Sequence, residues 1–302
     1  MIRIEQVTKR FGRGAGVRDV CLEIGSGDSV ALWGSNGAGK TTLIRCVLGL
    51  IPFGGEIRVG GHDVRRRGKH ARMLIGYVPQ ELSFYDEFRV NEAVVFFGRL
   101  KGLGALRADD VLGRVGLNGE GRKRIRELSG GMKQRLALAI AMLGDPPILI
   151  LDEVTASLDA CGRREFVSLL SGLCGAGRTM LFASHRLEEI AALAKRVAVL
   201  EKGTLERTVD AADFATGIAV GDRGGTVVHL VIPAPARAEA MQVLRSGGLV
   251  PTLNGVGVLV RVDENRKAIP FGLLSQAGVR VDDFEVIRGD GHGAAGVHKE
   301  TP

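Results

Sequence analysis

The chain has 302 residues, of which 45% are hydrophobic and 5% are aromatic, and its formal net charge is +7. This length and composition provide enough apolar surface for a buried core and favour about two domains. No window of about 18 apolar residues lacks charges, so we expect no membrane-spanning helix. The N-terminus alternates like a strand and has no long apolar stretch, so we do not expect a signal peptide.

The cysteines give a prediction about the compartment. Four are present, far apart and without a C-x-x-C pair: Cys21, Cys46, Cys161 and Cys174. We expect reduced thiols in or near the core of a cytosolic protein, not disulfides or a zinc site.

Two basic clusters stand out, at residues 65–72 and 122–126. Contact with nucleic acid or anionic lipid headgroups is one interpretation of such clusters. Solvated surface is the interpretation we favour, because no aromatic residues interleave with the charges as in a strand-binding groove. No nucleic-acid partner is therefore expected.

Strand and helix patterns alternate along most of the chain. Residues 1–32 have the pattern of short strands that end in SVALW, and a glycine loop then opens a helix. Two further strands are predicted in GEIRVGG and LIGYVPQ, followed by a mostly helical region over about residues 86–143. PPILILDE has the pattern of a buried parallel strand. Helices and strands then alternate again, which predicts an α/β fold with a parallel sheet covered on both faces.

The character of the sequence changes near residue 221, which divides a domain of residues 1–220 from one of residues 221–302. The second part has the order β-α-β-β-α-β, with a hairpin signal at Asn254-Gly255. This order predicts a small α+β ferredoxin-like domain. The last dozen residues are expected to be a frayed tail.

A glycine-rich segment between a strand and a helix has the sequence GSNGAGKTT, which fits the phosphate-loop pattern G-x-x-x-x-G-K-[ST]. Glycines let successive N–H groups wrap phosphate oxygens, and the helix N-terminus favours negative charge. Lys40 would reach the β- and γ-phosphates of ATP, and the Thr41 hydroxyl would reach Mg²⁺. The residues expected to bind ATP here are Gly34, Ser35, Asn36, Gly37, Ala38, Gly39, Lys40, Thr41 and Thr42.

The buried strand ILILDE delivers two carboxylates to its tip, Asp152 and Glu153. Asp152 can hold Mg²⁺, usually through water, as the acidic partner of the phosphate loop. Glu153 can take a proton from the attacking water or orient it. A solvated turn is the alternative for adjacent acids, and the four apolar residues before them argue against it.

A second candidate anion site occurs in LSGGMKQR, Leu128 to Arg135, where Ser129 has the position of a helix N-cap. With this motif the chain resembles the ATP-binding-cassette (ABC) ATPases, in which LSGGMKQR looks like the signature sequence. Six motifs occur in the order of that family over about residues 1–210. The resemblance implies a P-loop NTPase (RecA-like) core with a helical subdomain.

The resemblance assigns roles to further residues. It implies that Phe11 stacks on adenine, that Gln80 touches the Mg²⁺ and water region, and that Asp159 lies in the D-loop. His185 has the switch position, where it would bond to the γ-phosphate and the attacking water. Val154 stands where the family often has proline, which affects geometry rather than a chemical group.

The resemblance also implies partners. Two nucleotide domains would sandwich two ATP molecules, each site using one chain's phosphate loop and the partner's Ser129, Gly130 and Gly131. This chain would form a homodimer or pair with a paralogous ATPase. It would drive a separate membrane permease, as a cytoplasmic protein peripheral on the inner face of the membrane.

The details of the motifs and the extra C-terminal domain look like ATPases of the ABC-2 export type. A narrower similarity is to the ATPase subunit that matures the copper sites of nitrous oxide reductase, which implies copper or sulfur species, or copper-enzyme maturation. The alternative is a soluble ABC ATPase acting on nucleic acid or ribosomes. Such proteins typically carry a coiled-coil insertion or two cassettes, and neither is found here.

The role of the C-terminal domain stays open between two readings. It could be a sensor for a small molecule or metal, or a dimerisation or docking domain. Its acidic residues are scattered and form no ligand set, so we favour dimerisation or docking.

Overall fold

A computed structural model describes residues 1–12, 15–104, 107–175, 177–214, 226–253 and 257–288. The chain divides into two compact units, Met1–Ala212 and Asp213–Pro302, which are described separately below. This division falls eight residues before the expected one, just ahead of a segment that lies outside the described residues.

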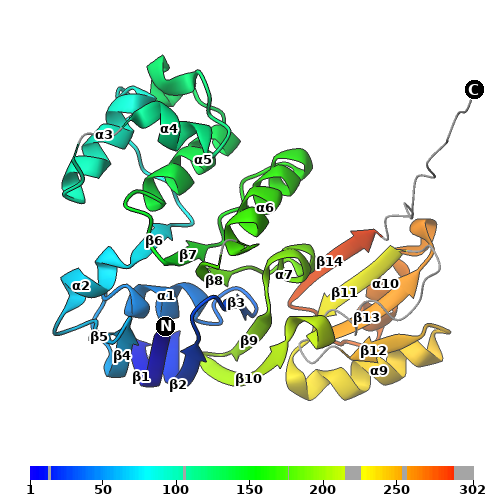
Figure 1. Cartoon of the computed structure of the whole chain (residues 1–302). Helices are drawn as coiled ribbons and strands as arrows, with labels where there is room; N and C mark the ends of the chain where they lie inside the picture. Colours follow the sequence, from blue (N-terminus) through cyan, green and yellow to red (C-terminus); the bar gives the residue numbers. More distant parts are fainter. Residues whose placement is uncertain (13–14, 105–106, 176, 215–225, 254–256, 289–302) are drawn as a thin grey trace, which may run out of the picture. The chain divides into compact units, whose positions relative to one another are not determined.

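The central sheet of the first unit has six strands, and five of them are parallel (Figure 1). β3, β7 and β8 are buried at every position, because helices and a second sheet cover both faces. This confirms the predicted α/β class. The order is β10 (Thr204–Asp210), β9 (Arg196–Glu201), β3 (Ser29–Trp33), β8 (Thr179–Ala183), β7 (Ile148–Asp152) and β6 (Ile75–Val78), with β10 antiparallel.

An antiparallel sheet forms the other layer of this unit. Its order is β2 (Ala15–Ile24), β1 (Ile2–Phe11), β4 (Gly54–Val59) and β5 (His62–Asp63). α1 (Lys40–Val47) buries Leu43, Ile44 and Val47 in a core cluster that takes residues from both sheets. This core fixes the N-terminus of α1, and with it the glycine loop, against the central sheet.

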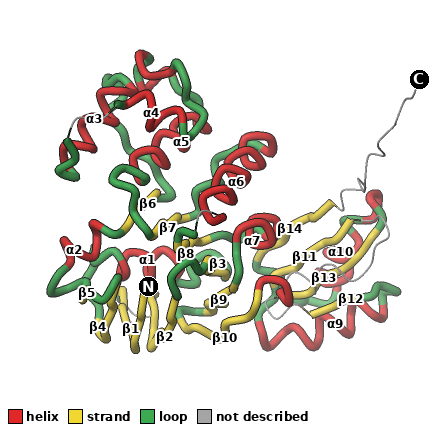
Figure 2. Tube along the Cα trace, in the orientation of Figure 1, coloured by secondary structure: helices red, strands yellow, loops and turns green. Residues whose placement is uncertain are grey.

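The helices of the first unit fall into two groups. α3, α4 and α5 gather together beyond β6, and α6 and α7 follow the later strands (Figures 1 and 2). Residues 86–143 contain the predicted helical region in several short pieces. Besides α1, the described helices of the first unit are α2 (Gly68–Met73), α3 (Val90–Leu100), α4 (Ala108–Gly113), η1 (Glu120–Arg122), η2 (Ile125–Glu127), α5 (Gly130–Ala141), α6 (Ala160–Gly175) and α7 (Leu187–Leu193).

In its described residues, the second unit is an antiparallel sheet with two α-helices, in the chain order β-α-β-β-α-β. The sheet order is β12-β13-β11-β14, so β12 and β14 are the edge strands. The expected turn at Asn254-Gly255 and the expected tail lie outside the described residues. The elements are β11 (Thr226–Val231), η3 (Ala234–Ala236), α9 (Arg237–Ser246), β12 (Pro251–Leu253), β13 (Gly257–Val262), η4 (Glu264–Arg266), α10 (Ile269–Gln276) and β14 (Asp283–Arg288).

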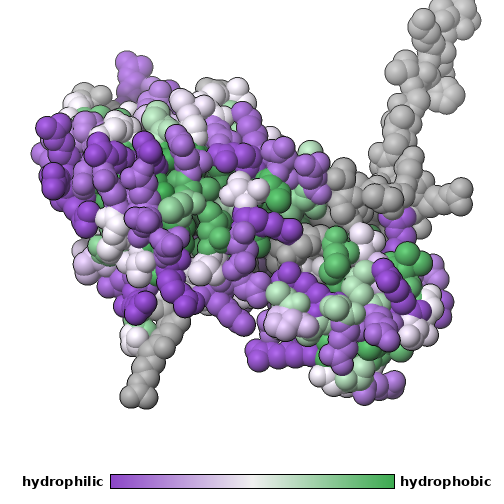
Figure 3. Space-filling model, turned by 90° about the horizontal axis from the view of Figure 1, so that it is seen from below, coloured by the Kyte–Doolittle hydropathy of each residue, from purple (hydrophilic) through white to green (hydrophobic). Residues whose placement is uncertain are grey.

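Figure 3 shows the hydropathy of one face of the molecule. Hydrophilic side chains predominate on the first unit, and hydrophobic side chains reach the surface of both units. Large hydrophobic side chains exposed on the second unit are Val250, Leu253 and Phe284. Among the described helices, none combines the length and hydropathy needed to cross a membrane.

The cysteines are free thiols, but the expectation that all lie in or near the core was wrong for two of them. Cys46 is buried in α1 and Cys174 is half-buried. Cys21 and Cys161 are exposed, because β2 and α6 each turn that position toward solvent.

Candidate active site

The glycine loop between β3 and α1 has a backbone conformation that residues with side chains could not easily adopt. Gly37 and Gly39 have φ values of +81° and +104°, in the left-handed region that favours glycine. A Cβ atom at Gly39 would lie 2.9 Å from the Gly16 carbonyl oxygen, and one at Gly34 would lie 2.4 Å from the Leu200 carbonyl oxygen. The glycines therefore allow the loop to lie tightly against neighbouring backbone.

Lys40 is buried inside this loop. Its Nζ donates hydrogen bonds to the carbonyl oxygens of Gly34 at 2.8 Å and Ser35 at 3.2 Å. It also forms an ion pair with Glu153 Oε1 at 3.2 Å. The ammonium group therefore lies at the point where the loop meets the acidic end of β7.

A cavity of about 250 Å³, here called the nucleotide cavity, opens in front of the loop. Phe11 is 45% exposed at this cavity, so its ring can accept a stacked base. The lining brings together residues from β1, β2, the loop, α1 and the segments that follow β6 and β7: Phe11, Gly16, Asn36, Gly37, Gly39, Lys40, Thr41, Thr42, Gln80 and Glu153. Gly34, Ser35 and Ala38 do not line it; the first two hold Lys40 through their carbonyl oxygens.

Asp152 and Thr41 form the oxygen donors expected for Mg²⁺. The Thr41 hydroxyl donates to Asp152 Oδ1 at 3.0 Å, although the two residues are 111 positions apart. Burial raises the pKa of Asp152, and the Thr41 hydrogen bond opposes this shift. No group of three or more His, Cys, Asp or Glu among the described residues is placed to hold a metal unaided. The donors fit Mg²⁺, which takes a few protein oxygens together with phosphate oxygens and water.

Glu153 and His185 approach each other at the ends of β7 and β8. His185 Nδ1 lies 3.7 Å from Glu153 Oε2, which is an ion-pair distance rather than a hydrogen bond. The neighbouring His185 lowers the pKa of Glu153 to about 2. Lys40 acts in the same direction, whereas burial acts in the opposite direction. Glu153 in turn raises the pKa of His185. Glu153 is therefore ionised at neutral pH.

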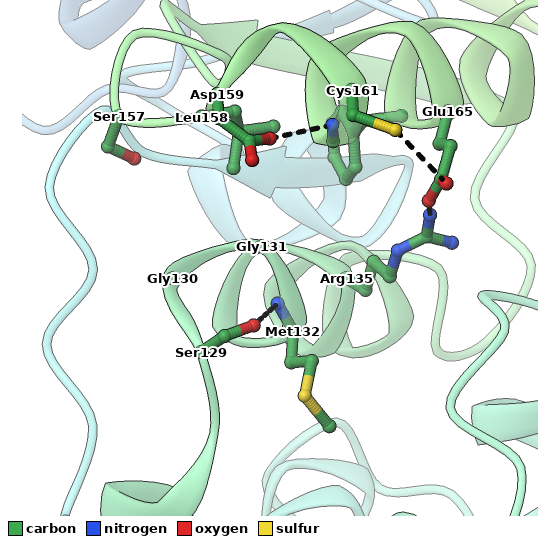
Figure 4. Close-up of a pocket in the computed structure, with 12 residues that line it drawn as sticks. Ser129, Gly130, Gly131, Met132, Arg135, Ser157, Leu158, Asp159, Cys161 and Glu165 are labelled. Atoms are coloured by element: carbon green, nitrogen blue, oxygen red, sulfur yellow. Dashed lines mark hydrogen bonds and ion pairs between the residues drawn. The ribbon is translucent and has the colours of Figure 1, made fainter.

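The signature residues line a different cavity, which we call the signature cavity (Figure 4). It has a volume of about 510 Å³ and lies between the start of α5 and the start of α6. Ser129 caps α5 by accepting a hydrogen bond from Met132 N at 3.3 Å. Gly130, Gly131 and Asp159 also line this cavity.

Across the signature cavity an ion pair joins the two helices. Arg135 Nη2 of α5 lies 2.8 Å from Glu165 Oε2 of α6. Asp159 Oδ1 accepts from Gly162 N at 2.8 Å, which holds the D-loop carboxylate at the start of α6 (Figure 4). The phosphate loop and the signature thus belong to two separate cavities of the same unit.

The two basic clusters differ in how their charges are paired. In the second cluster, Arg124 and Arg126 both pair with Glu87, the latter at 2.7 Å, and Lys123 pairs with Glu120 at 2.7 Å. Within the described part of the chain, no ion pair is found for the arginine and lysine side chains of residues 65–72. The second cluster is therefore a locally paired surface.

Sequence reasoning missed one group of polar residues behind the site. Thr155, Ser184 and Glu189 are buried and bonded to one another next to Glu153 and His185. The only sequence signal for this group was Glu189, an acidic residue four positions after His185. Whether Glu189 is buried depends on how α7 packs, which the sequence pattern does not show.

Comparison with known proteins places the chain. The model of the family described as "ABC transporter" matches residues 17–156. The daunorubicin resistance ATP-binding protein DrrA3 of Streptomyces coeruleorubidus is 34% identical over 95% of this chain and 92% of its own length. The linearmycin resistance ATP-binding protein LnrL of Bacillus subtilis (strain 168) is 31% identical, over 77% of this chain and 75% of the relative. The Nod factor export ATP-binding protein I of Burkholderia lata is 36% identical over 78% of each.

A solved structure agrees with the sequence relatives. The dimeric post-hydrolysis state of the ATP-binding cassette MJ0796, bound to ADP and Pi, superposes with a TM-score of 0.63 at 26% identity. The match covers 70% of this chain and 99% of that cassette. The chain therefore belongs to the ATP-binding subunits of ABC transporters, the ATPases that hydrolyse ATP to power a membrane permease.

Proposed function

We propose that this chain is the ATPase of an ABC-2 type exporter and that it works as a pair of identical subunits. One observation carries the proposal: the nucleotide cavity contains a phosphate loop and Glu153 but no signature residues, which line a separate cavity. Its relatives are named for resistance to daunorubicin and linearmycin and for Nod factor export, which supports export as the direction.

The phosphate end of ATP would be held by the glycine loop. Loop amides and the buried Lys40 would contact the phosphate oxygens, with Lys40 exchanging its carbonyl partners for the γ-phosphate. Thr41 and Asp152 would hold Mg²⁺, which when bound neutralises charge on the β- and γ-phosphates. Phe11 would stack on the adenine.

Glu153, His185 and Gln80 would handle the attacking water. His185 and Lys40 keep Glu153 ionised, so its carboxylate could orient the water or take a proton from it. His185 faces Glu153 and would bond to the γ-phosphate, and Gln80 lines the same cavity. Positioning and charge stabilisation then supply most of the rate enhancement.

Ser129, Gly130 and Gly131 would complete the site of the partner subunit. The N-terminus of α5 presents unpaired N–H groups at a cavity large enough for phosphates, and a Cβ at Gly130 would meet nothing within 4 Å. Asp159 also lines the signature cavity, where it would respond to the presence of the partner subunit. ABC cassettes dimerise, and two identical chains are the default symmetric pair.

A groove between the sheet core and the helical group is our proposed permease site. It has a volume of about 220 Å³, and its lining includes Tyr77 of β6, three positions before Gln80 in the sequence. Its largely apolar lining suits a helix from a membrane subunit: Leu48, Leu50, Ile75, Tyr77, Ile140 and Ala141, together with the charged Arg72 and Lys101. Docking here would place the chain on the inner face of the cell membrane, in the cytoplasm.

The second unit would be a ferredoxin-like domain for dimerisation or docking. Its chain order and its sheet order support this identity. Phe284 is 56% exposed on the edge strand β14, which supports a protein contact there. The cargo stays a prediction: the resemblance to the nitrous oxide reductase maturation ATPase favours copper or sulfur species, whereas the named relatives favour drugs or Nod factors.

Two substitutions test the catalytic assignment. Glu153→Gln should bind ATP and form stable dimers but turn over very slowly, because the water is no longer polarised. Lys40→Ala should lose ATP binding, because the buried ammonium is removed from the loop. Wild-type turnover by the first variant or wild-type affinity in the second would refute these roles.

A third substitution tests the shared site. Ser129→Arg should leave ATP binding by the monomer intact and abolish ATP-driven dimerisation, because it fills the signature cavity. Analytical ultracentrifugation with ATP in a Glu153→Gln background measures the effect. Normal dimerisation would contradict the proposal, and retention of nucleic acid instead of membrane co-purification would favour the soluble alternative.

A further inference from the structure

Glu189 is a buried carboxylate that the nucleotide cavity does not use. It lies in the first turn of α7, is 5% exposed, and accepts hydrogen bonds on both oxygens. The Thr155 hydroxyl donates to Oε1, and the Ser184 hydroxyl donates to Oε2 at 2.6 Å. Thr155 is 3% exposed and Ser184 is 2% exposed, so water does not compete for these bonds.

The two bonded residues belong to the two loops that carry the reacting side chains. Thr155 follows Glu153 by two positions in the turn after β7, and Ser184 directly precedes His185 after β8. Glu189 therefore joins the two loops through a single carboxylate group. Arg186 supports the same junction, since its N–H donates to Ser184 Oγ at 3.0 Å.

Glu153 needs such support because its backbone is strained. Its φ of +46° lies in the left-handed region, which a glutamate seldom adopts, and such strain persists only when the surroundings fix it. One constraint is the bond from Glu153 N to the Ala183 carbonyl oxygen at 3.1 Å. The Thr155–Glu189–Ser184 bridge is a second constraint on the same turn.

We propose that Glu189 is a positioning residue that holds Glu153 and His185 in register through Thr155 and Ser184. The inference rests on the proposed roles of Glu153 and His185 in hydrolysis. Glu189 does not line the nucleotide cavity, so it acts on turnover and not on the binding of ATP. Removal of the bridge frees both loops to move apart, and a small misplacement of reacting groups lowers the rate strongly.

The first test compares Glu189→Ala with Glu188→Ala in the full chain. Glu188 is the adjacent carboxylate on the same helix turn and is exposed, which makes it a matched control. We expect Glu189→Ala to lower kcat per nucleotide-binding site by about tenfold or more, with the ATP Kd within about threefold of wild type. Glu188→Ala should leave both values unchanged.

Normalising turnover to the number of ATP sites separates positioning from damage to the fold. A merely structural role would lower the number of binding sites and the total rate together, and would leave kcat per site unchanged. That result, or an unchanged kcat, would overturn the proposal. Slow turnover in Glu153→Gln tests the proposed function independently.

A second test does not depend on the stability of Glu189→Ala. Thr155→Val removes one hydroxyl with little change in volume, and Ser184→Ala removes the other. Each should lower kcat per site by a few-fold, and Thr155→Val combined with Glu189→Ala should be no slower than Glu189→Ala alone. Wild-type kcat in both single variants, or multiplicative losses in the double variant, would overturn the proposal.

Discussion

Substitution of Gly76 by alanine tests how closely the signature helix must lie against the central sheet. Gly76 is buried in β6, and its Cβ would lie 2.5 Å from the Ala141 carbonyl oxygen and 2.8 Å from Leu149 Cδ2. To reach an ordinary contact near 3.4 Å, the end of α5 must move by about 0.9 Å. Overpacking of this kind costs about 1–3 kcal/mol.

The expected fall in Tm follows from the size of the first unit. For a unit of about 200 residues, 2 kcal/mol corresponds to a shift of about 4–8 °C. The same movement would displace the N-terminus of α5, so ATP-driven dimerisation should weaken while ATP binding stays near wild type. Circular dichroism melting and sedimentation in a Glu153→Gln background measure the two effects.

Gly172→Ala provides the matched control. Gly172 lies in α6 and is exposed, and a Cβ there would meet nothing within 4 Å. Alanine at an open helix site should stabilise the protein by about 0.5–1 kcal/mol relative to glycine. The same glycine-to-alanine change is therefore expected to increase stability at residue 172 and to decrease it at residue 76. Equal melting temperatures for the two variants would refute the steric reasoning.

Three other predictions concern the nucleotide site. Gly39→Ala should lower stability by about 2–4 kcal/mol and abolish ATP binding, because its φ is +104° and its Cβ would meet a backbone oxygen at 2.9 Å; a normal Tm would contradict this. Thr41→Val should raise the Mg²⁺ concentration needed for turnover, and chelation by EDTA should stop the wild-type ATPase; turnover insensitive to EDTA would exclude the metal. The raised pKa of His185 stabilises the fold below its ordinary value near 6.5, and this contribution is lost as pH rises through the raised pKa. The free energy of unfolding, measured with urea from about pH 6 to about pH 9, should therefore differ less between wild type and His185→Ala as the pH rises. Glu153 stays ionised throughout this range.

Local chemistry made the phosphate loop predictable from the sequence. The positions that need glycine are set by local backbone geometry, as at Gly39, so the sequence pattern is enough to predict the conformation of the loop. The βαββαβ order of the second unit was predictable for a similar reason, since strand and helix periods are local. Thr41 and Asp152 were paired from the sequence only because each belongs to a recognised motif.

Burial and charge pairing could not be predicted in the same way. Glu188 and Glu189 are adjacent and chemically identical, and only the packing of α7 decides which one is buried. The neutralisation of Arg124 depends on Glu87, which lies 37 positions earlier and is brought close by the fold. Cys21 was expected inside because cysteines usually are, but an alternating strand exposes every second residue.

The two cavities explain why ATP rather than contact area would control the pairing of subunits. In the proposed dimer, a phosphate held by one chain's Lys40 would present its outer oxygens to solvent until a partner's Ser129 and glycines covered them. Each nucleotide would then supply charge-assisted bonds across the interface, which are lost when the γ-phosphate leaves. If Glu153 and His185 act at the same phosphate as proposed, the bridge through Glu189 would keep hydrolysis and separation of the pair coupled in one event.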